Sequence, residues 1–277
     1  MRVETYRGEL RALVGVLAFF LASSASAGSA ADSLDAGWRF SVTPYLWVPR
    51  IDGTLNFTAR PGTGNEFLVT IEPIDYIEHL NVPIMVAAAA RKGPWSLATD
   101  FFFVDFSGDR ATVTSVTGPG GNVEVPIDAG SSVGLQATIW SLGGGYAVVR
   151  GPTATLQILG GFRYFAVETS LDWQFTAGSA TAPQSGTLTQ SDDLWDAIVG
   201  IQGEARFGGG RWLLPYYLDA GTGSSSLTLK AMAGLGYAFG WWDLRLMYHH
   251  LQYDAGESAL IQELSLSGPA LGASFRF

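Results

Sequence analysis

The sequence predicts an all-β protein, an antiparallel transmembrane β-barrel of about ten strands, and three observations support this prediction. Apolar and polar residues alternate with a period of two along several segments, which is typical of strands with one face toward lipid. Beyond the N-terminus, no apolar run approaches the roughly 20 residues that a membrane-spanning helix needs. Charged residues make up only 15% of the 277-residue chain, whereas aromatic residues make up 13% and glycine contributes 35 residues.

This composition excludes several other classes of protein. Disordered chains and coiled coils are rich in charge, and even an ordinary soluble domain contains about 25% charged residues. The chain has no cysteine, which excludes a small domain held together by disulfides. Its net charge of −9 argues against nucleic acid as a partner, because phosphate binding needs a basic surface.

Residues 1–27 have the features of a secretory signal peptide. Basic residues precede an apolar run over residues 12–22, and Ala25 and Ala27 form an A-x-A cleavage site. The run is too short to span about 30 Å of hydrocarbon, so a retained membrane anchor is the weaker interpretation. We therefore expect residues 28–277 to form the barrel domain after export.

The segment Leu194–Phe207 shows the alternation most clearly. Successive side chains of a strand point to opposite faces, so every second residue belongs to the same face. One face is uncharged and aromatic at both ends, and consists of Trp195, Ala197, Val199, Ile201, Gly203, Ala205 and Phe207. The other face holds three charged residues and Gln202. A soluble β-sandwich also alternates, but its outer face would be hydrated and rich in Lys and Glu.

Ten segments between turn signals are predicted to be strands, with short turns at one end of the barrel and longer loops at the other. They cover residues 37–49, 81–91, 94–107, 131–149, 153–175, 190–207, 211–221, 225–239, 241–254 and 261–277. Residues 50–80 are harder to interpret: 53–60 and 66–72 would form a further hairpin and raise the count to twelve, and 74–80 has helical spacing. In 133–149, Trp140, Leu142, Tyr146 and Val148 compete with Leu135 and Ile139 for the outer face.

Three parts of the chain resemble a family of uncharacterised bacterial outer-membrane β-barrel proteins. They are Pro44–Trp47 with Ile51–Gly53, Ala90–Leu97, and the terminal segment Ser267–Phe277. The resemblance implies a barrel in the outer membrane of a Gram-negative bacterium and implies no known activity. The last strand ends in Phe277, which resembles the signal that such barrels present to their assembly machinery. The bilayer, lipopolysaccharide and that machinery are the expected partners, and the oligomeric state stays open.

The inward face is predicted to carry most of the ionic side chains. The lumen-lining candidates are Arg39, Arg91, Asp100, Arg163, Asp196, Glu204, Arg206, Lys230, Arg245 and His249, with Arg211, Asp243 and Arg276 on the same registers. Narrow barrels are filled by their side chains, and wide aqueous channels need 16–18 strands. We therefore expect a polar, largely filled lumen in a membrane-embedded protein that is structural or displays loops. The surplus of bases keeps a narrow, weakly anion-selective, porin-like channel as the alternative.

A membrane-embedded lipid-modifying enzyme is the second alternative, and we do not expect it. The three histidines are His79, His249 and His250, and His250 is predicted to face outward at the level of the lipid headgroups. Nucleophilic catalysis needs a serine beside such a base, but Ser131, Ser132, Ser258 and Ser267 lie in loops or at strand ends without a recognisable motif. No cofactor is expected. Asp192, Asp193 and Glu257 are loop carboxylates, and we assign no metal to them.

The N-terminal assignment gives a testable prediction. The protein recovered from the membrane should begin at Gly28, because signal peptidase cleaves after the small residues at 25 and 27. Intact-mass spectrometry measures this directly. A mature protein that still carries residues 1–27 would contradict it.

Overall fold

The computed structural model describes residues 37–57, 65–71, 73, 83–108, 117–118, 121–122, 132–174, 185–255 and 261–277. Nearly all of these residues are in strands. The strands are β1 (Arg39–Trp47), β2 (Arg50–Phe57), β3 (Asn65–Ile71), β4 (Ile84–Lys92), β5 (Trp95–Gly108), β6 (Thr117–Gly118), β7 (Gly121–Asn122), β8 (Ser132–Arg150), β9 (Ala154–Gln174), β10 (Ser185–Phe207), β11 (Trp212–Gly223), β12 (Leu227–Ala238), β13 (Trp242–Asp254) and β14 (Ile261–Arg276). In this part of the chain, no helix is long and apolar enough to cross a membrane.

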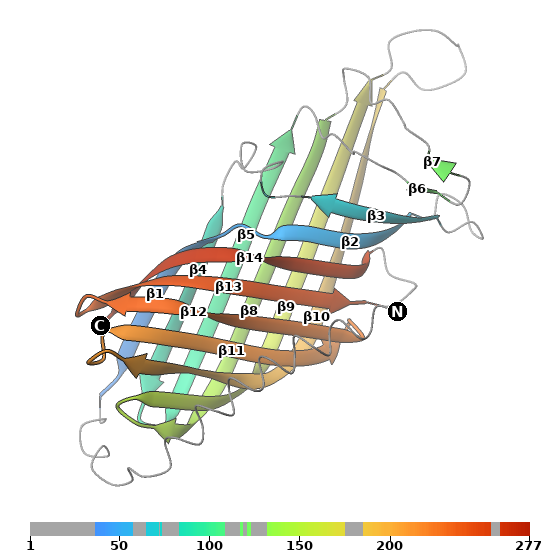
Figure 1. Ribbon diagram of the computed structural model, residues 1–277. Coiled ribbons are helices and arrows are strands. Elements are labelled where there is room, and N and C mark those ends of the chain that lie inside the picture. The colour runs from blue at the N-terminus through green and yellow to red at the C-terminus, as the bar shows by residue number, and fades with distance from the viewer. Residues whose placement is uncertain are drawn as a thin grey trace, which may run out of the picture.

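Ten strands close into an antiparallel barrel, as the sequence predicts. The ring runs β1-β4-β5-β8-β9-β10-β11-β12-β13-β14 and closes through pairing of β1 with β14 (Figure 1). At the closing seam, Val42 lies opposite Phe275 and Leu46 opposite Leu271. We call the end that carries the tight turns Gly93–Pro94, Gly208–Arg211 and Phe239–Trp241 the turn end, and the opposite end the loop end.

The predicted hairpin after β1 exists, but it does not widen the ring. β2 pairs with β3 and also with the first half of β14, whereas the second half of β14 pairs with β1. β1 and β2 thus pair with different halves of the same strand, β14. Val48 and Pro49 separate the two strands. Proline has no N–H for the ladder, which explains an interruption at this point. The helical spacing predicted for residues 74–80 lies outside the described residues.

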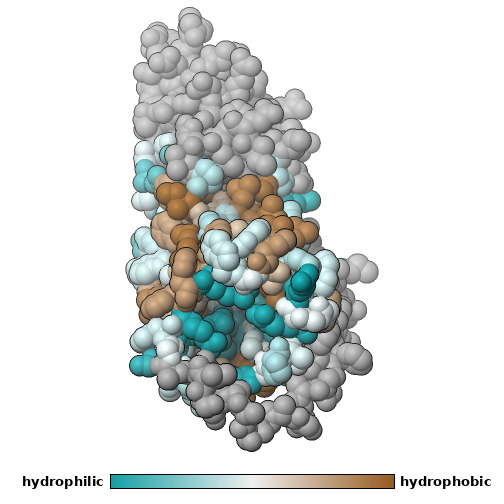
Figure 2. All heavy atoms as spheres, turned by 90° about the vertical axis from the view of Figure 1, so that its left-hand side faces the viewer, coloured by the Kyte–Doolittle hydropathy of each residue, from teal (hydrophilic) through white to brown (hydrophobic). Residues whose placement is uncertain are grey.

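The outer surface of the barrel is apolar, as a transmembrane barrel requires. Trp95, Val199 and Leu246 are 65%, 63% and 59% exposed and belong to a larger set of exposed hydrophobic side chains. Exposing so much apolar surface to water would be costly. Viewed from the left-hand side of Figure 1, hydrophilic residues gather in the middle of the face, and hydrophobic residues lie above them and to their left (Figure 2). Aromatic rings meet in pairs near the turn end, including Trp95 with Tyr146 and Phe239 with Trp242 at centroid distances of 4.9 and 4.5 Å. This arrangement is the interfacial girdle of a membrane barrel.

The orientation of β8, which the sequence left open, is settled by burial. Tyr146 and Val148 are 45% and 48% exposed, whereas Ile139 is 4% exposed and faces the lumen. Trp140 lies on the outer face, where its ring packs edge-on against Phe162 of β9 at 5.2 Å. A register shift between Ala147 and Val149 marks a β-bulge at the turn end.

The lipid-facing assignment predicts a large difference between two substitutions on one strand. Val199→Arg should lower the free energy of unfolding in lipid by about 2–4 kcal/mol, because it places a guanidinium in the hydrocarbon. Thr189→Arg on the same strand, beyond the apolar band, should change it by less than about 0.5 kcal/mol. Urea unfolding in lipid vesicles measures both. Equal effects would contradict the assignment.

Candidate functional site

The side chains inside the barrel form two layers, because the type of side chain changes along the inward face of the strands. On six strands, a polar inward-facing residue is followed, two positions closer to the loop end, by an apolar inward-facing residue. These steps are Tyr45 to Trp47, Asp100 to Phe102, Ser141 to Ile139, Arg163 to Phe165, Asp196 to Leu194 and His249 to Leu251. We call the side toward the turn end the polar layer and the side toward the loop end the apolar layer.

Arg163 of β9 lies at the centre of the polar layer and is fully buried. Its guanidinium forms an ion pair with Asp219 of β11 and donates hydrogen bonds to Ser141 Oγ at 3.2 Å and Thr228 Oγ1 at 3.0 Å. The hydroxyl of Tyr217 donates a further hydrogen bond to Asp219. A buried charge is tolerated only when it is paired and hydrogen-bonded in this way. Arg163 thereby ties together four strands of the wall.

A second ion pair crosses the lumen from one wall to the other. Lys230 of β12 pairs with Asp100 of β5, and these strands lie five places apart in the ring of ten, which makes them opposite walls. The Tyr45 hydroxyl of β1 donates a hydrogen bond of 2.7 Å to the other oxygen of Asp100. The Lys230 ammonium also lies 5.8 Å from the centre of the Tyr217 ring. These contacts place side chains across the full diameter of the barrel.

A third cluster of ionic side chains lies toward the turn end. Asp243 of β13 forms ion pairs with Arg245 and Arg276. Glu204 of β10 bridges Arg245 at 3.1 Å and Arg206 at 2.8 Å. Because β10 and β13 are not neighbours in the ring, the Arg245–Glu204 pair also spans the lumen.

The apolar layer consists of buried side chains that belong to eight strands. Its members are Trp47, Met85, Phe102, Val104, Ile139, Phe165, Val167, Leu194, Leu251, Tyr253, Leu266 and Ala270. The ring of Trp47 packs edge-on against Phe102 at 5.4 Å, and Phe165 packs against Tyr253 at 4.9 Å. The expected polar lumen therefore describes the turn-end part, whereas the loop-end part resembles the core of a soluble protein.

The structure places most of the lumen candidates inside the barrel. Arg163, Asp196, Lys230 and His249 are buried there, and Asp100, Glu204, Arg206 and Arg245 are partly buried there. Arg39 and Arg91 are exposed at the turn end, where they face each other across β1 and β4. Asp196 accepts hydrogen bonds from the N–H and Oγ of Ser225 at 2.9 and 2.6 Å.

Two corrections concern charge. Arg211, expected in the lumen, is exposed at a turn and lies 3.4 Å from the outward-facing Tyr237 hydroxyl, because it precedes the first residue of β11. Asp219 was not among the candidates, although it is the ion-pair partner of Arg163. Its position on the same face as Tyr217 was the available signal, since an acid on an inward register must find a base.

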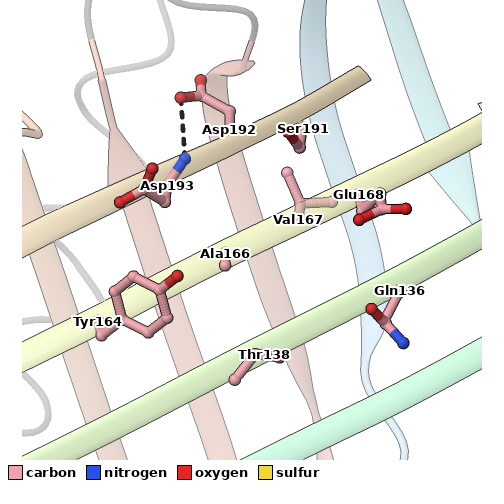
Figure 3. Close-up of a pocket in the computed structure, with 9 residues that line it drawn as sticks. All are labelled: Gln136, Thr138, Tyr164, Ala166, Val167, Glu168, Ser191, Asp192 and Asp193. Atoms are coloured by element: carbon pink, nitrogen blue, oxygen red, sulfur yellow. Dashed lines mark hydrogen bonds between the residues drawn. The ribbon is translucent and has the colours of Figure 1, made fainter. Parts of the chain in front are cut away.

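A separate depression lies on the outer wall of β8, β9 and β10 toward the loop end. It has a volume of about 220 Å³ and is lined by Gln136, Thr138, Tyr164, Ala166, Val167, Glu168, Ser191, Asp192 and Asp193 (Figure 3). The backbone N–H of Asp193 donates a hydrogen bond of 2.9 Å to Asp192 Oδ1. Within the described residues, no group of three or more acidic or imidazole side chains could hold a metal ion, and Glu257 lies outside them.

Comparison with known proteins finds barrels among solved structures and no match elsewhere. No family model and no curated protein matches the chain. The outer membrane protease OmpT from Escherichia coli has 8% identity over 91% of this chain and 100% of its own, with a TM-score of 0.46. The translocator domain of the autotransporter NalP from Neisseria meningitidis has 16% identity over 100% of both chains, with a TM-score of 0.44. The attachment invasion locus protein Ail of Yersinia pestis has 11% identity over 87% and 99%, with a TM-score of 0.35. We transfer no activity from these proteins.

The buried pair in the polar layer gives a prediction about stability. Arg163→Met should lower the free energy of unfolding by about 3–5 kcal/mol, because it leaves the Asp219 carboxylate buried without its cation. Adding Asp219→Asn should recover most of this loss, since the second change removes the uncompensated charge. Urea unfolding of the single and double variants measures the difference. A double variant that is less stable than Arg163→Met would contradict the pairing.

Proposed function

We propose that the chain is an outer-membrane β-barrel with a closed lumen, which anchors and displays the segments at its loop end. The observation that carries this proposal is the Lys230–Asp100 pair, which joins opposite walls in the middle of the barrel. The apolar layer lies beyond this pair toward the loop end and consists of hydrophobic side chains from β1, β4, β5, β8, β9, β10, β13 and β14. Ions and polar solutes would have to break both layers to pass.

The balance of charge supports a closed lumen over an anion channel. The enclosed part holds five bases and five acids, which are Arg163, Arg206, Lys230, Arg245 and Arg276 against Asp100, Asp196, Glu204, Asp219 and Asp243. Arg39, Arg91 and Arg211 are exposed at the turn end and lie outside this part, so with Asp219 included its bases and acids are equal in number. Selectivity for anions needs unpaired positive charge along the path, and these bases already have carboxylate partners.

The lengths of the strands support a role in display at the loop end. A membrane-spanning strand needs about 9–11 residues, whereas β8, β9 and β10 contain 19, 21 and 23 residues. These strands project beyond the neighbouring strands β11–β14 (Figure 1). We propose the bilayer and lipopolysaccharide as the surroundings of the barrel, the barrel assembly machinery as a partner through Phe277, and membership of the outer-membrane family that the sequence resembles.

Conductance in planar bilayers tests the proposal. The wild-type barrel should give no resolved current steps over a range of voltages. A triple variant, Trp47→Ala, Phe102→Ala and Lys230→Ala, should give steps, because it removes side chains from both layers while the wall stays intact. Heat-modifiable gel migration of both proteins is the control for folding. Steps in the wild-type protein would contradict the closed lumen.

A further inference from the structure

One pair of polar side chains on the outer wall is placed as a nucleophile and its base. His250 of β13 and Ser267 of β14 are directly opposite each other across the two strands. The ring Nδ1 of His250 lies 2.6 Å from Ser267 Oγ. At this distance an imidazole can accept the hydroxyl proton, which is what activation of a serine requires. The sequence offered no serine partner for a histidine, because the register that brings these two together is not visible in it.

The alternation of both strands directs this pair away from the lumen. On β13, the neighbours Leu251 and Tyr253 are buried inside, whereas Tyr248 on the His250 face is 58% exposed. On β14, Leu271 lies on the same face as Ser267 and is 53% exposed. The pair therefore lies on the outer wall, where both side chains are partly exposed, and it is separate from the polar layer.

The height of the pair along the wall matches the ester region of a membrane lipid. Toward the turn end, the outer face of β13 and β14 continues with the apolar pairs Tyr248–Pro269 and Leu246–Leu271. Toward the loop end, it continues with the polar pairs Gln252–Ser265 and Asp254–Glu263. The boundary between apolar and polar outer residues is the boundary between hydrocarbon and headgroups. Acyl esters of membrane lipids lie at this boundary.

A cationic side chain stands on the other side of the serine. Arg50 of β2 is the cross-strand partner of Ser267, so histidine, serine and arginine form one row over β13, β14 and β2. The Arg50 guanidinium is half exposed and lies 3.0 Å from Asp52, which fixes its position. A guanidinium beside a nucleophile can stabilise the negative charge that develops on an attacked carbonyl oxygen.

We infer that Ser267 and His250 form a catalytic pair for hydrolysis of acyl esters of membrane lipids on the outer wall of the barrel. Ser267 Oγ attacks the ester carbonyl carbon while its proton passes to His250 Nδ1, and Arg50 faces the resulting oxyanion. The intermediate collapses with loss of the lipid alkoxide, which takes the proton from His250 and leaves an acyl-serine. Water then attacks the acyl-serine, His250 accepts and returns its proton, and the fatty acid and free Ser267 are released.

Labelling with a long-chain alkyl fluorophosphonate tests the nucleophile directly. In detergent or vesicles, the folded full barrel should acquire one phosphonyl group, which peptide mass spectrometry should locate on Ser267. His250→Ala should slow this labelling by roughly 10²–10⁴-fold, which is the usual contribution of a general base. Ser267→Ala should abolish it, and Ser265→Ala, on the same face of the same strand, should leave it unchanged. Heat-modifiable migration shows that each variant is folded.

Release of fatty acid tests the substrate. The barrel in vesicles of phosphatidylethanolamine and phosphatidylglycerol should release ordinary fatty acids if glycerophospholipid is the ester, and in vesicles that contain lipopolysaccharide it should release hydroxy fatty acids if lipid A is. Either release, lost in Ser267→Ala and kept in Ser265→Ala, supports the inference. Absence of labelling on wild-type Ser267, or no release from either kind of vesicle, would overturn it. The conductance result is independent of both outcomes.

Discussion

The structure depends on one constraint: hydrocarbon offers no hydrogen-bond partner to a backbone N–H or C=O. A sheet that crosses a membrane must therefore satisfy every strand edge with another strand, and only a closed ring does this. The pairing of β1 with β14 supplies the closure. Once the ring is closed, each strand has one face toward lipid and one toward the axis, and the alternation of side chains follows. Val199 faces outward for the same reason that Asp196 faces inward.

Inside the ring of ten strands, buried ionic side chains pair with one another, because a buried charge without a partner is costly. Arg163 with Asp219, and Lys230 with Asp100, are ion pairs between strands that are not adjacent in the ring. Removing one partner of such a pair is far more costly than replacing both partners by apolar residues. Such pairs therefore contribute less to the free energy of folding than to the choice of one pairing of the strands. Toward the loop end, the apolar layer packs buried side chains from eight strands against one another. The two layers are the basis of the closed lumen that we propose.

The sequence predicted the strands and their outer face better than the arrangement of the side chains inside the barrel. The outer face of residues 194–207 follows from counting every second residue, and the number of strands follows from the turns. The apolar layer could not be predicted in this way, because a residue such as Phe102 or Phe165 on an inward register looks like an exception to the alternation. The layer can be recognised only when the register of neighbouring strands is known, because the register shows that their inward-facing apolar residues lie at the same level of the barrel.

The same limit applied to the individual sites. Asp219 and Arg163 are 56 residues apart, and nothing local in the sequence connects them. His250 and Ser267 lie on consecutive strands, but their pairing depends on the register between β13 and β14. The hairpin of β2 and β3 was predicted as an option for residues 53–60 and 66–72, whereas its attachment to β14 outside the ring depended on the break at Pro49. The alternation of apolar and polar residues shows which face a side chain occupies, but it does not show which residues of two paired strands lie opposite each other.

Site-directed spin labelling along β10 tests the central claim most directly. The chain has no cysteine, so single cysteines introduced one at a time over residues 195–207 can each be labelled in lipid vesicles. The accessibility of the label to oxygen, which concentrates in hydrocarbon, should rise and fall with a period of two and peak at odd-numbered positions such as 197, 199 and 201. Maxima at even-numbered positions, or no period, would contradict a closed barrel with its apolar face toward lipid.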